Sequence, residues 1–452
     1  MDLSDRERSS CSVLHKISFG LGHVYNDLCA AMWFSYTLFY FQVVLEVQSQ
    51  TAGVLLMIGQ VVDAVATPIV GWTVDYTKSR KLWHFIGTIA VSLGFTLIFS
   101  LKTNTVNSSI LFNYGLVITV FQIGWAMVQI SHLSLIPEIS TNHSHSSDLT
   151  AIRYTASVCC SVTVYCITLI ILDNNGGTIS IGPNDYYKFK EIALIITFLG
   201  IIASLLFYCG ILGLPDQTSY EFITDEADDA NNLCSNNKNQ HFLKSLITYL
   251  VSVLYMASRL FTTLSLIYIP LYIAERAANE NTQTDGIRQT IAAVPLVSYI
   301  ASFLTSIFLK FRLSICNDKI IYLIGSLLGL CACGWITYGV PLNSNAQLYC
   351  IAVLLGMSGS ATMVASLCLT ANYVKINGYG GGFVYSIVTF TDKLISGCVV
   401  LLVQNMQCVS RDLCPQYYEY VLSYICGGVS ILGIVSLAVL QWHTNNNRRS
   451  IF

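Results

Sequence analysis

Long apolar segments, each about long enough to cross a lipid bilayer, dominate this sequence. Hydrophobic residues make up 54% of the 452 residues, and charged residues only 11%. A transmembrane helix needs about 20 apolar residues to cross roughly 30 Å of hydrocarbon. A backbone in lipid must satisfy its own hydrogen bonds, and these segments are too long for barrel strands. The sequence therefore predicts an all-α membrane protein.

Short polar connections divide the apolar sequence into about twelve candidate transmembrane helices. The first six lie at roughly 17–44, 52–72, 83–101, 110–137, 150–172 and 191–213. The second six lie at roughly 244–274, 288–310, 319–341, 347–371, 380–404 and 418–441. The acidic, asparagine-rich segment 214–243 has the composition of a flexible linker. We expect two six-helix bundles, at 1–213 and 244–452, which is the layout of a transporter with internal pseudo-symmetry.

Lysine and arginine are concentrated in alternate loops, and this bias predicts the orientation in the membrane. It places both termini and the 214–243 linker in the cytosol. The glycosylation sequon at Asn107 then falls in a non-cytosolic loop, where the modifying enzyme can reach it. A second sequon at Asn142 falls in a cytosolic loop and should stay unmodified.

Two further motifs depend on this orientation. Cys408 and Cys414 lie in a polar loop outside the cytosol, where a disulfide can form, although the sequence leaves open whether it does. In the linker, the segment 220–223 begins with Tyr220 and fits a tyrosine-based endosomal sorting pattern. Such short patterns often arise by chance.

Several function classes are disfavoured by composition. The net charge is -2 and no basic cluster is present, which argues against a nucleic-acid partner. No Cys/His spacing resembles a metal site, and most of the 16 cysteines lie in apolar segments as small packing residues. No nucleophile with its base is evident, so we expect no enzyme activity and no cofactor. The expected partners are a small-molecule substrate and the lipid bilayer.

Five charged residues lie inside the predicted membrane helices: Asp27, Asp63, Arg153, Arg259 and Lys393. Each costs about 2.5–3.5 kcal/mol to insert at a helix centre, so such residues usually face a cavity or a partner. Three positive charges against two acids favour an anionic or zwitterionic solute.

Polar residues share a helix face with these charges or line a face of their own. The sets are His23/Asn26/Asp27, Gly59/Asp63/Thr67, Gln122/Trp125/Gln129/His132, Arg153/Ser157/Ser161, Tyr255/Arg259/Thr263 and Tyr385/Thr389/Lys393/Gly397. The predicted substrate contacts are Asp27, Trp125, Gln129, Arg259 and Tyr385. The predicted coupling residues are Asp63, Lys393 and Arg153. Two simpler interpretations stay open: that Asp63 forms a structural ion pair with Arg153 or Lys393, and that His23 and His132 are hydrogen-bonded packing residues.

The segment 71–81 resembles the loop signature of the major facilitator superfamily. The resemblance implies the major facilitator fold, with twelve transmembrane helices in two six-helix bundles. It also implies that Gly71, Asp75 and Arg80 act as a conformational latch.

Residues 59–64, with Pro68 and Gly71, resemble the glycoside, pentoside and hexuronide:cation symporter group typified by melibiose permease. Three positions differ from that group. Thr67 replaces its second carboxylate in the helix at 52–72, and Gln129 and Leu133 replace a carboxylate and an aromatic residue in the helix at 110–137. These differences argue against sodium coordination and sugar stacking.

A closer resemblance is to a family of animal major facilitator proteins linked to cysteine import into lysosomes and melanosomes. It rests on residues 22–23, 26–30, 129–138, 149–154, 383–385 and 392–393. It implies a small amino-acid-like solute such as cysteine, a proton as the coupling ion, and a lysosome-related membrane. The alternatives are a carbohydrate:cation symporter at the plasma membrane and a non-transporting membrane scaffold.

Overall fold

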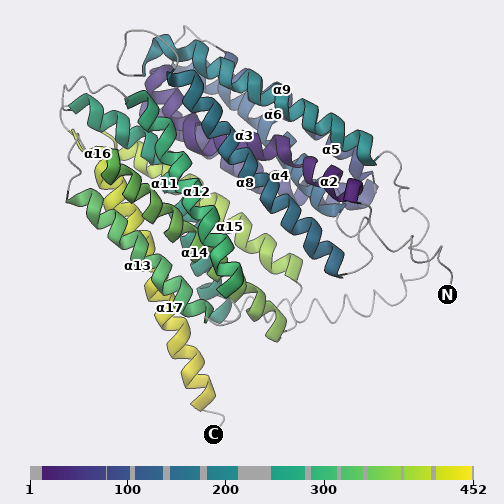
Figure 1. Ribbon diagram of the computed structural model, residues 1–452, viewed down its shortest axis with the longest axis vertical. Coiled ribbons are helices and arrows are strands. Elements are labelled where there is room, and N and C mark those ends of the chain that lie inside the picture. The colour runs from purple at the N-terminus through teal and green to yellow at the C-terminus, as the bar shows by residue number, and fades with distance from the viewer. Residues whose placement is uncertain are drawn as a thin grey trace, which may run out of the picture. The chain divides into compact units, whose positions relative to one another are not determined.

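Helices make up almost all of the chain that the computed structural model describes (Figure 1). The structure describes residues 13–77, 79–101, 107–135, 143–173, 181–211, 246–279, 287–312, 317–338, 345–377, 381–408 and 414–449. No strand occurs within these ranges. The predicted all-α fold is confirmed.

The first compact unit contains the helices before residue 212. They are α2 (Val13–Leu21), α3 (Val24–Phe39), the π-helical turn η1 (Tyr40–Val44), α4 (Ser49–Thr77), α5 (Arg80–Ser100), α6 (Asn107–Ser134), α8 (His143–Asp173), the short 3-10 turn η2 (Pro183–Asp185) and α9 (Tyr186–Ile211). The predicted linker 214–243 and its Tyr220 lie outside the described residues.

The second compact unit contains the helices after the linker. They are α11 (Leu246–Asn279), α12 (Ile287–Arg312), α13 (Asp318–Thr337), α14 (Asn345–Asn377), α15 (Gly381–Met406), α16 (Tyr417–Tyr420), the π-helical turn η5 (Val421–Ile425) and α17 (Cys426–Arg449).

Ten helical stretches among the described residues are long and apolar enough to cross a membrane. They include α4, α5, α6, α8 and α9 in the first unit, and α11, α12, α13, α14 and the stretch Tyr417–Thr444 in the second. The other two predicted spans are α3, which is only 16 residues long, and α15, which carries Asp392 and Lys393.

The structure differs from the sequence prediction at two connections. The helix expected at 17–44 is interrupted between Leu21 and Val24, so that α2 and α3 follow each other as one broken helix (Figure 1). The expected loop at 71–81 is mostly helical, because α4 continues to Thr77 and α5 begins at Arg80. Gly71 and Asp75 of the predicted latch therefore lie on the last turns of α4.

Close approach of α5 and α6 shows how the first unit packs. A Cβ atom added at Gly94 would lie 2.7 Å from the Cβ of Phe121, and one at Gly124 would lie 2.8 Å from the backbone nitrogen of Val91. Small residues at such crossings let helices in lipid gain van der Waals contact, since burial of apolar surface does not drive their association.

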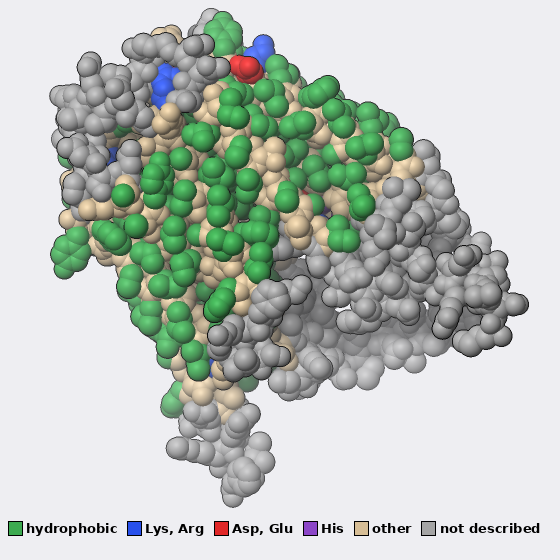
Figure 2. Space-filling model, viewed as in Figure 1, with side chains coloured by type: hydrophobic (Ala, Val, Ile, Leu, Met, Phe, Trp, Pro, Cys, Tyr) green, Lys and Arg blue, Asp and Glu red, His purple; other side chains and the backbone are tan. Residues whose placement is uncertain are grey.

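Hydrophobic side chains cover much of the face seen in Figure 2. Large apolar residues are strongly exposed on several helices, among them Leu93, Phe112, Phe198 and Leu304. A water-soluble protein rarely exposes apolar patches of this extent. The surface is that of an integral, multi-pass membrane protein.

Candidate functional site

The break between α2 and α3, at Gly22 and His23, forms the base of the candidate site in the first unit. The Gly22 N–H donates to the Phe19 carbonyl at 3.1 Å and closes a turn. A Cβ atom at Gly22 would lie 2.6 Å from Phe207 and 2.7 Å from His132, both fully buried, so only glycine fits. The turn leaves His23 as the N-cap residue of α3, with its side chain directed into the bundle.

The His23 ring lies between a carboxylate and a guanidinium group. Its Nδ1 atom is 3.0 Å from Asp27 Oδ1, one helical turn along α3, although the contact lacks the geometry of a linear hydrogen bond. Its Nε2 atom is 3.1 Å from Nη2 of Arg153 on α8. Asp27 and Arg153, both predicted from sequence, are thus joined through a histidine.

Several polar atoms around this group lack a hydrogen-bond partner among the described residues. They include Asp27 Oδ2, Arg153 Nε and Asn26 Oδ1. Asn26 is fully buried, and its Nδ2 donates to the Trp125 carbonyl at 3.1 Å. Buried polar groups without partners cost about 1–3 kcal/mol each, so such a group indicates a place for a ligand or water.

Two further buried histidines hold the broken helix in place. His132 Nε2 donates to the Phe19 carbonyl at 2.7 Å, and the two rings stack at 4.2 Å. His84 Nε2 donates to the Gly22 carbonyl at 3.0 Å, and its Nδ1 accepts from the Tyr208 hydroxyl at 2.7 Å. His132 therefore behaves as a hydrogen-bonded packing residue. Sequence reasoning missed His84, although its spacing of four residues from Thr88 within an apolar segment is a sequence signal for a shared polar face.

Two residues of the predicted polar line on α6 pair with each other. Trp125 Nε1 donates to Gln129 Oε1 at 3.1 Å, and Gln122 is buried beside Gly59 of α4. Trp125 and Gln129 are each partly exposed, so both retain accessible surface.

Asp63 lies on α4 with its side chain 8% exposed. The Thr67 hydroxyl donates to its Oδ1 at 3.2 Å and to its backbone carbonyl at 2.7 Å, as the helical spacing predicted. Its proposed coupling partner Lys393 belongs to the second unit, so the pair stays a prediction.

In the second unit, Arg259 of α11 pairs with Asp392 of α15 at 3.3 Å between Nε and Oδ2. Asp392 is buried and within 3.4 Å of the Ser396 hydroxyl. The Arg259 side chain keeps 40% of its surface exposed. Asp392 was not among the predicted site residues, and the Tyr385 side chain lies outside the described side chains.

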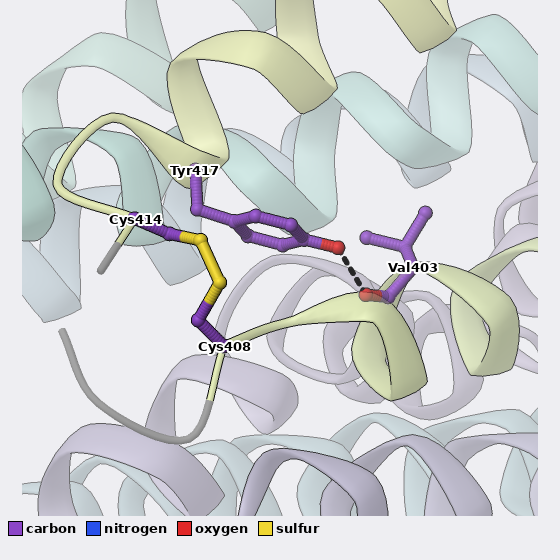
Figure 3. The surroundings of a disulfide bond; sticks show 4 residues. All are labelled: Val403, Cys408, Cys414 and Tyr417. Carbon is purple, nitrogen blue, oxygen red and sulfur yellow. Dashed lines mark hydrogen bonds between the residues drawn. A yellow bond between two sulfur atoms is a disulfide. The ribbon is translucent and has the colours of Figure 1, made fainter.

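The connection between α15 and α16 is closed by a disulfide between Cys408 and Cys414, whose Cα atoms are 6.0 Å apart (Figure 3). The Tyr417 hydroxyl beside it donates to the Val403 carbonyl. The bond that the sequence left open is thus present. Asn107, expected in a loop, is the first residue of α6, and Asn142 lies outside the described residues.

Comparisons with known proteins agree with this architecture. The model of the MFS/sugar transport protein family matches residues 18–406. Major facilitator superfamily domain-containing protein 12 from Homo sapiens is 33% identical over 470 residues, covering 97% of this chain and 95% of the relative. The protein of that name from Mus musculus is 33% identical, covering 95% and 94%. An uncharacterized symporter from Synechocystis is 27% identical over 199 residues, 42% of this chain and 36% of the symporter.

Solved structures are similar in fold at low sequence identity. A point mutant of the nucleoside transporter NupG has a TM-score of 0.70 and 13% identity, covering 94% of this chain and 99% of its own. The xylose transporter XylE from E. coli, partially occluded and inward open, has a TM-score of 0.64 and 12% identity, covering 96% and 99%. These similarities confirm the predicted fold of two six-helix bundles.

Proposed function

This chain belongs to the MFS/sugar transport protein family of membrane transporters, and we propose that it moves a small amino-acid-like solute, with cysteine as the first candidate, by alternating access. The family and the structural neighbours are transporters rather than enzymes. The substrate is therefore a small molecule that crosses the bilayer unchanged.

The observation that carries the proposal is the pair of opposite charges on either side of His23. An α-amino acid presents a carboxylate and an ammonium group. Arg153 has an unpartnered Nε within the described part of the chain, and a guanidinium is suited to a carboxylate. Asp27 Oδ2 likewise has no partner there, and a carboxylate accepts hydrogen bonds from an ammonium group.

The second unit offers a further cation. Arg259 contacts Asp392 through Nε, and its partly exposed side chain leaves guanidinium surface accessible. We propose that Arg259 contacts the solute, together with Trp125, Gln129 and Tyr385. Asp63 and Lys393 are proposed as the coupling pair, with the proton as the coupling ion.

We further propose that both termini are cytosolic and that the protein resides in a lysosome-related membrane. The Lys/Arg bias of the loops and the sorting pattern at Tyr220 support these two assignments. The disulfide Cys408–Cys414 supports a non-cytosolic position for its loop, because disulfides persist in oxidising compartments and are rare in the cytosol.

Uptake by the purified protein in proteoliposomes tests the solute. Radiolabelled cysteine should accumulate, and melibiose should not. Arg153→Met should lower cysteine uptake about ten- to a hundredfold, because a hydrogen bond to a charged group contributes roughly 1.5–3 kcal/mol.

Arg276→Met is the control, since Arg276 lies in the last turn of α11, in the second unit, and contacts Tyr272. It removes the same charge in another place and should keep uptake near the wild-type level. Accumulation of melibiose instead of cysteine would favour the carbohydrate:cation symporter. Retention of full cysteine uptake by Arg153→Met would remove Arg153 from the binding site.

A further inference from the structure

The contacts of His23 determine which of its ring nitrogens carries hydrogen. Nε2 lies 3.1 Å from Arg153 Nη2. A guanidinium has only N–H donors, so Nε2 must be the acceptor and is unprotonated in this structure. A neutral ring then carries its hydrogen on Nδ1, which faces Asp27 Oδ1 at 3.0 Å.

A proton on Nε2 and the contact with Arg153 therefore exclude each other, because both use the same lone pair. We propose that His23 is a proton-binding site whose occupation releases Arg153 to bind the carboxylate of the transported solute. This inference rests on the proposed function for its solute and adds to it a proton site distinct from Asp63.

The groups that face His23 come from four other helices and from its own. Asp27 lies on α3, Arg153 on α8, His132 on α6 and His84 on α5. The α9 group nearest to them is Tyr208, which donates to His84. His84 and His132 each donate Nε2–H to a backbone carbonyl, an arrangement that a neutral ring satisfies.

Binding of a proton to His23 changes the net charge of this group and therefore the charge of the ligand that it favours. With His23 neutral, Asp27 and Arg153 leave no net charge. With His23 protonated, the group carries one positive charge, and the imidazolium stays next to the Asp27 carboxylate. A net positive site surrounded by buried side chains favours an anion, and the carboxylate of a solute restores neutrality.

This arrangement couples the two ligands. The carboxylate gains the Nη2 donor of Arg153, in addition to the unpartnered Nε, only after the proton has displaced Nη2 from His23. Each ligand therefore raises the affinity for the other by the same factor. One proton would accompany each carboxylate. A gradient of protons then drives accumulation of the solute, because loaded and empty forms bind protons differently.

The first test needs no solute. The full chain contains 8 histidines, and ¹⁵N-histidine NMR of the purified protein in nanodiscs distinguishes the two ring nitrogens of each. The His23 signals are identified by their loss in His23→Gln. At neutral pH, Nε2 of His23 should be unprotonated and Nδ1 protonated. In Arg153→Met, the Nε2 signal of His23 should move, because its hydrogen-bond donor is gone. An Nε2 signal that is the same with and without Arg153, or an Nε2 that already carries hydrogen, would overturn the inference.

The second test counts protons. Cysteine added to wild-type protein in weakly buffered solution should cause uptake of about one proton per molecule bound. His23→Gln can still accept from Arg153 and donate to Asp27, but it does not titrate. It should bind cysteine more weakly and without proton uptake, because Arg153 is not released, and His443→Gln, a histidine near the end of α17, should behave as the wild type. Proton uptake retained by His23→Gln would contradict the proposal.

Failure of the proposed solute and failure of the proton site give different results. Wild-type vesicles that fail to accumulate cysteine would contradict the proposed solute, while the NMR measurement, made without solute, decides on the proton site independently.

Discussion

The buried carboxylate of Glu275, near the end of α11, accepts a hydrogen bond from the backbone N–H of Tyr418 at 2.8 Å. Its Oε2 atom also lies 3.4 Å from the N–H of Glu419, in the first turn of α16. The first N–H groups of a helix have no partner within that helix, and a negative charge there is favoured by the helix dipole. Glu275 thus caps α16 and joins it to α11 beside the disulfide loop.

Removal of this cap should destabilise the second unit. Glu275→Ala should lower the free energy of unfolding by about 1–2 kcal/mol, as loss of a helix cap does, and Glu275→Gln, which keeps an acceptor, by less. Thermal unfolding in detergent measures both variants. Glu419→Ala is the control, since its side chain is more exposed and its backbone N–H remains. Equal stability of Glu275→Ala and wild type would show that the cap contributes nothing.

Gly22 should tolerate no larger side chain. In Gly22→Ala, the added methyl group meets buried atoms of Phe207 and His132 at under 3 Å. Overpacking of this kind costs about 1–3 kcal/mol. Gly428→Ala on α17 is the matched control, because no atom lies within 4 Å of its Cβ position. The melting temperature of the purified protein should fall in the first variant and stay constant or rise in the second. An unchanged melting temperature for Gly22→Ala would mean that the helix break can adjust.

The charged site residues could be predicted from the sequence, but their partners could not. Asp27 and Arg153 stand out because charge in an apolar segment is costly, and that reasoning needs no structure. Helical spacing relates residues within one helix, so it placed His23 next to Asp27 but said nothing about Arg153 on α8. Likewise, helical spacing does not show that Asp392 of α15 pairs with Arg259 of α11, because the two residues lie on different helices.

The broken helix was missed for a related reason. Glycine and histidine within an apolar segment do not by themselves end a helix, and the residues of α2 and α3 form one apolar segment in the sequence. The break depends on His84 and His132, whose donors satisfy the carbonyls of Gly22 and Phe19 from other helices. Such contacts between distant segments are tertiary, so helix periodicity does not reveal them.

Membrane orientation can be read from two sites. In Cys408→Ser, Cys414 becomes a free thiol, and a membrane-impermeant maleimide should label it only from the non-cytosolic side. Asn107→Gln should abolish a glycosidase-sensitive shift in electrophoretic mobility. Labelling of Cys414 from the cytosolic side, or glycan attached at Asn142, would invert the proposed orientation.

Asp63→Asn separates the two proposed proton sites. Asparagine keeps the oxygen that accepts from Thr67 but cannot titrate. If Asp63 carries the coupling proton, the variant should fold, exchange cysteine at equal pH and lose pH-driven accumulation. Asp318→Asn, at the start of α13, is the control. Full pH-driven accumulation by Asp63→Asn would end the role of Asp63 and leave His23 as the proton site.

Variants of the Arg259–Asp392 pair distinguish a role in solute binding from a role in stabilising the fold. Asp392→Met leaves the Arg259 guanidinium without its acidic partner and should destabilise the second unit. The loss should be smaller than the roughly 3–5 kcal/mol of a fully buried pair, because 40% of the Arg259 side chain is exposed. Adding Arg259→Met removes the unpaired charge and should restore the melting temperature.

Transport by this double variant decides the role of Arg259. If Arg259 contacts the solute, cysteine uptake should stay at least tenfold below wild type even though the protein is again stable, because the charged hydrogen-bond donor is missing. If the pair only holds α11 and α15 together, the double variant should regain both stability and uptake. Melting temperature and initial uptake rate, measured on the same preparations of the single and double variants, therefore give opposite results for the two roles.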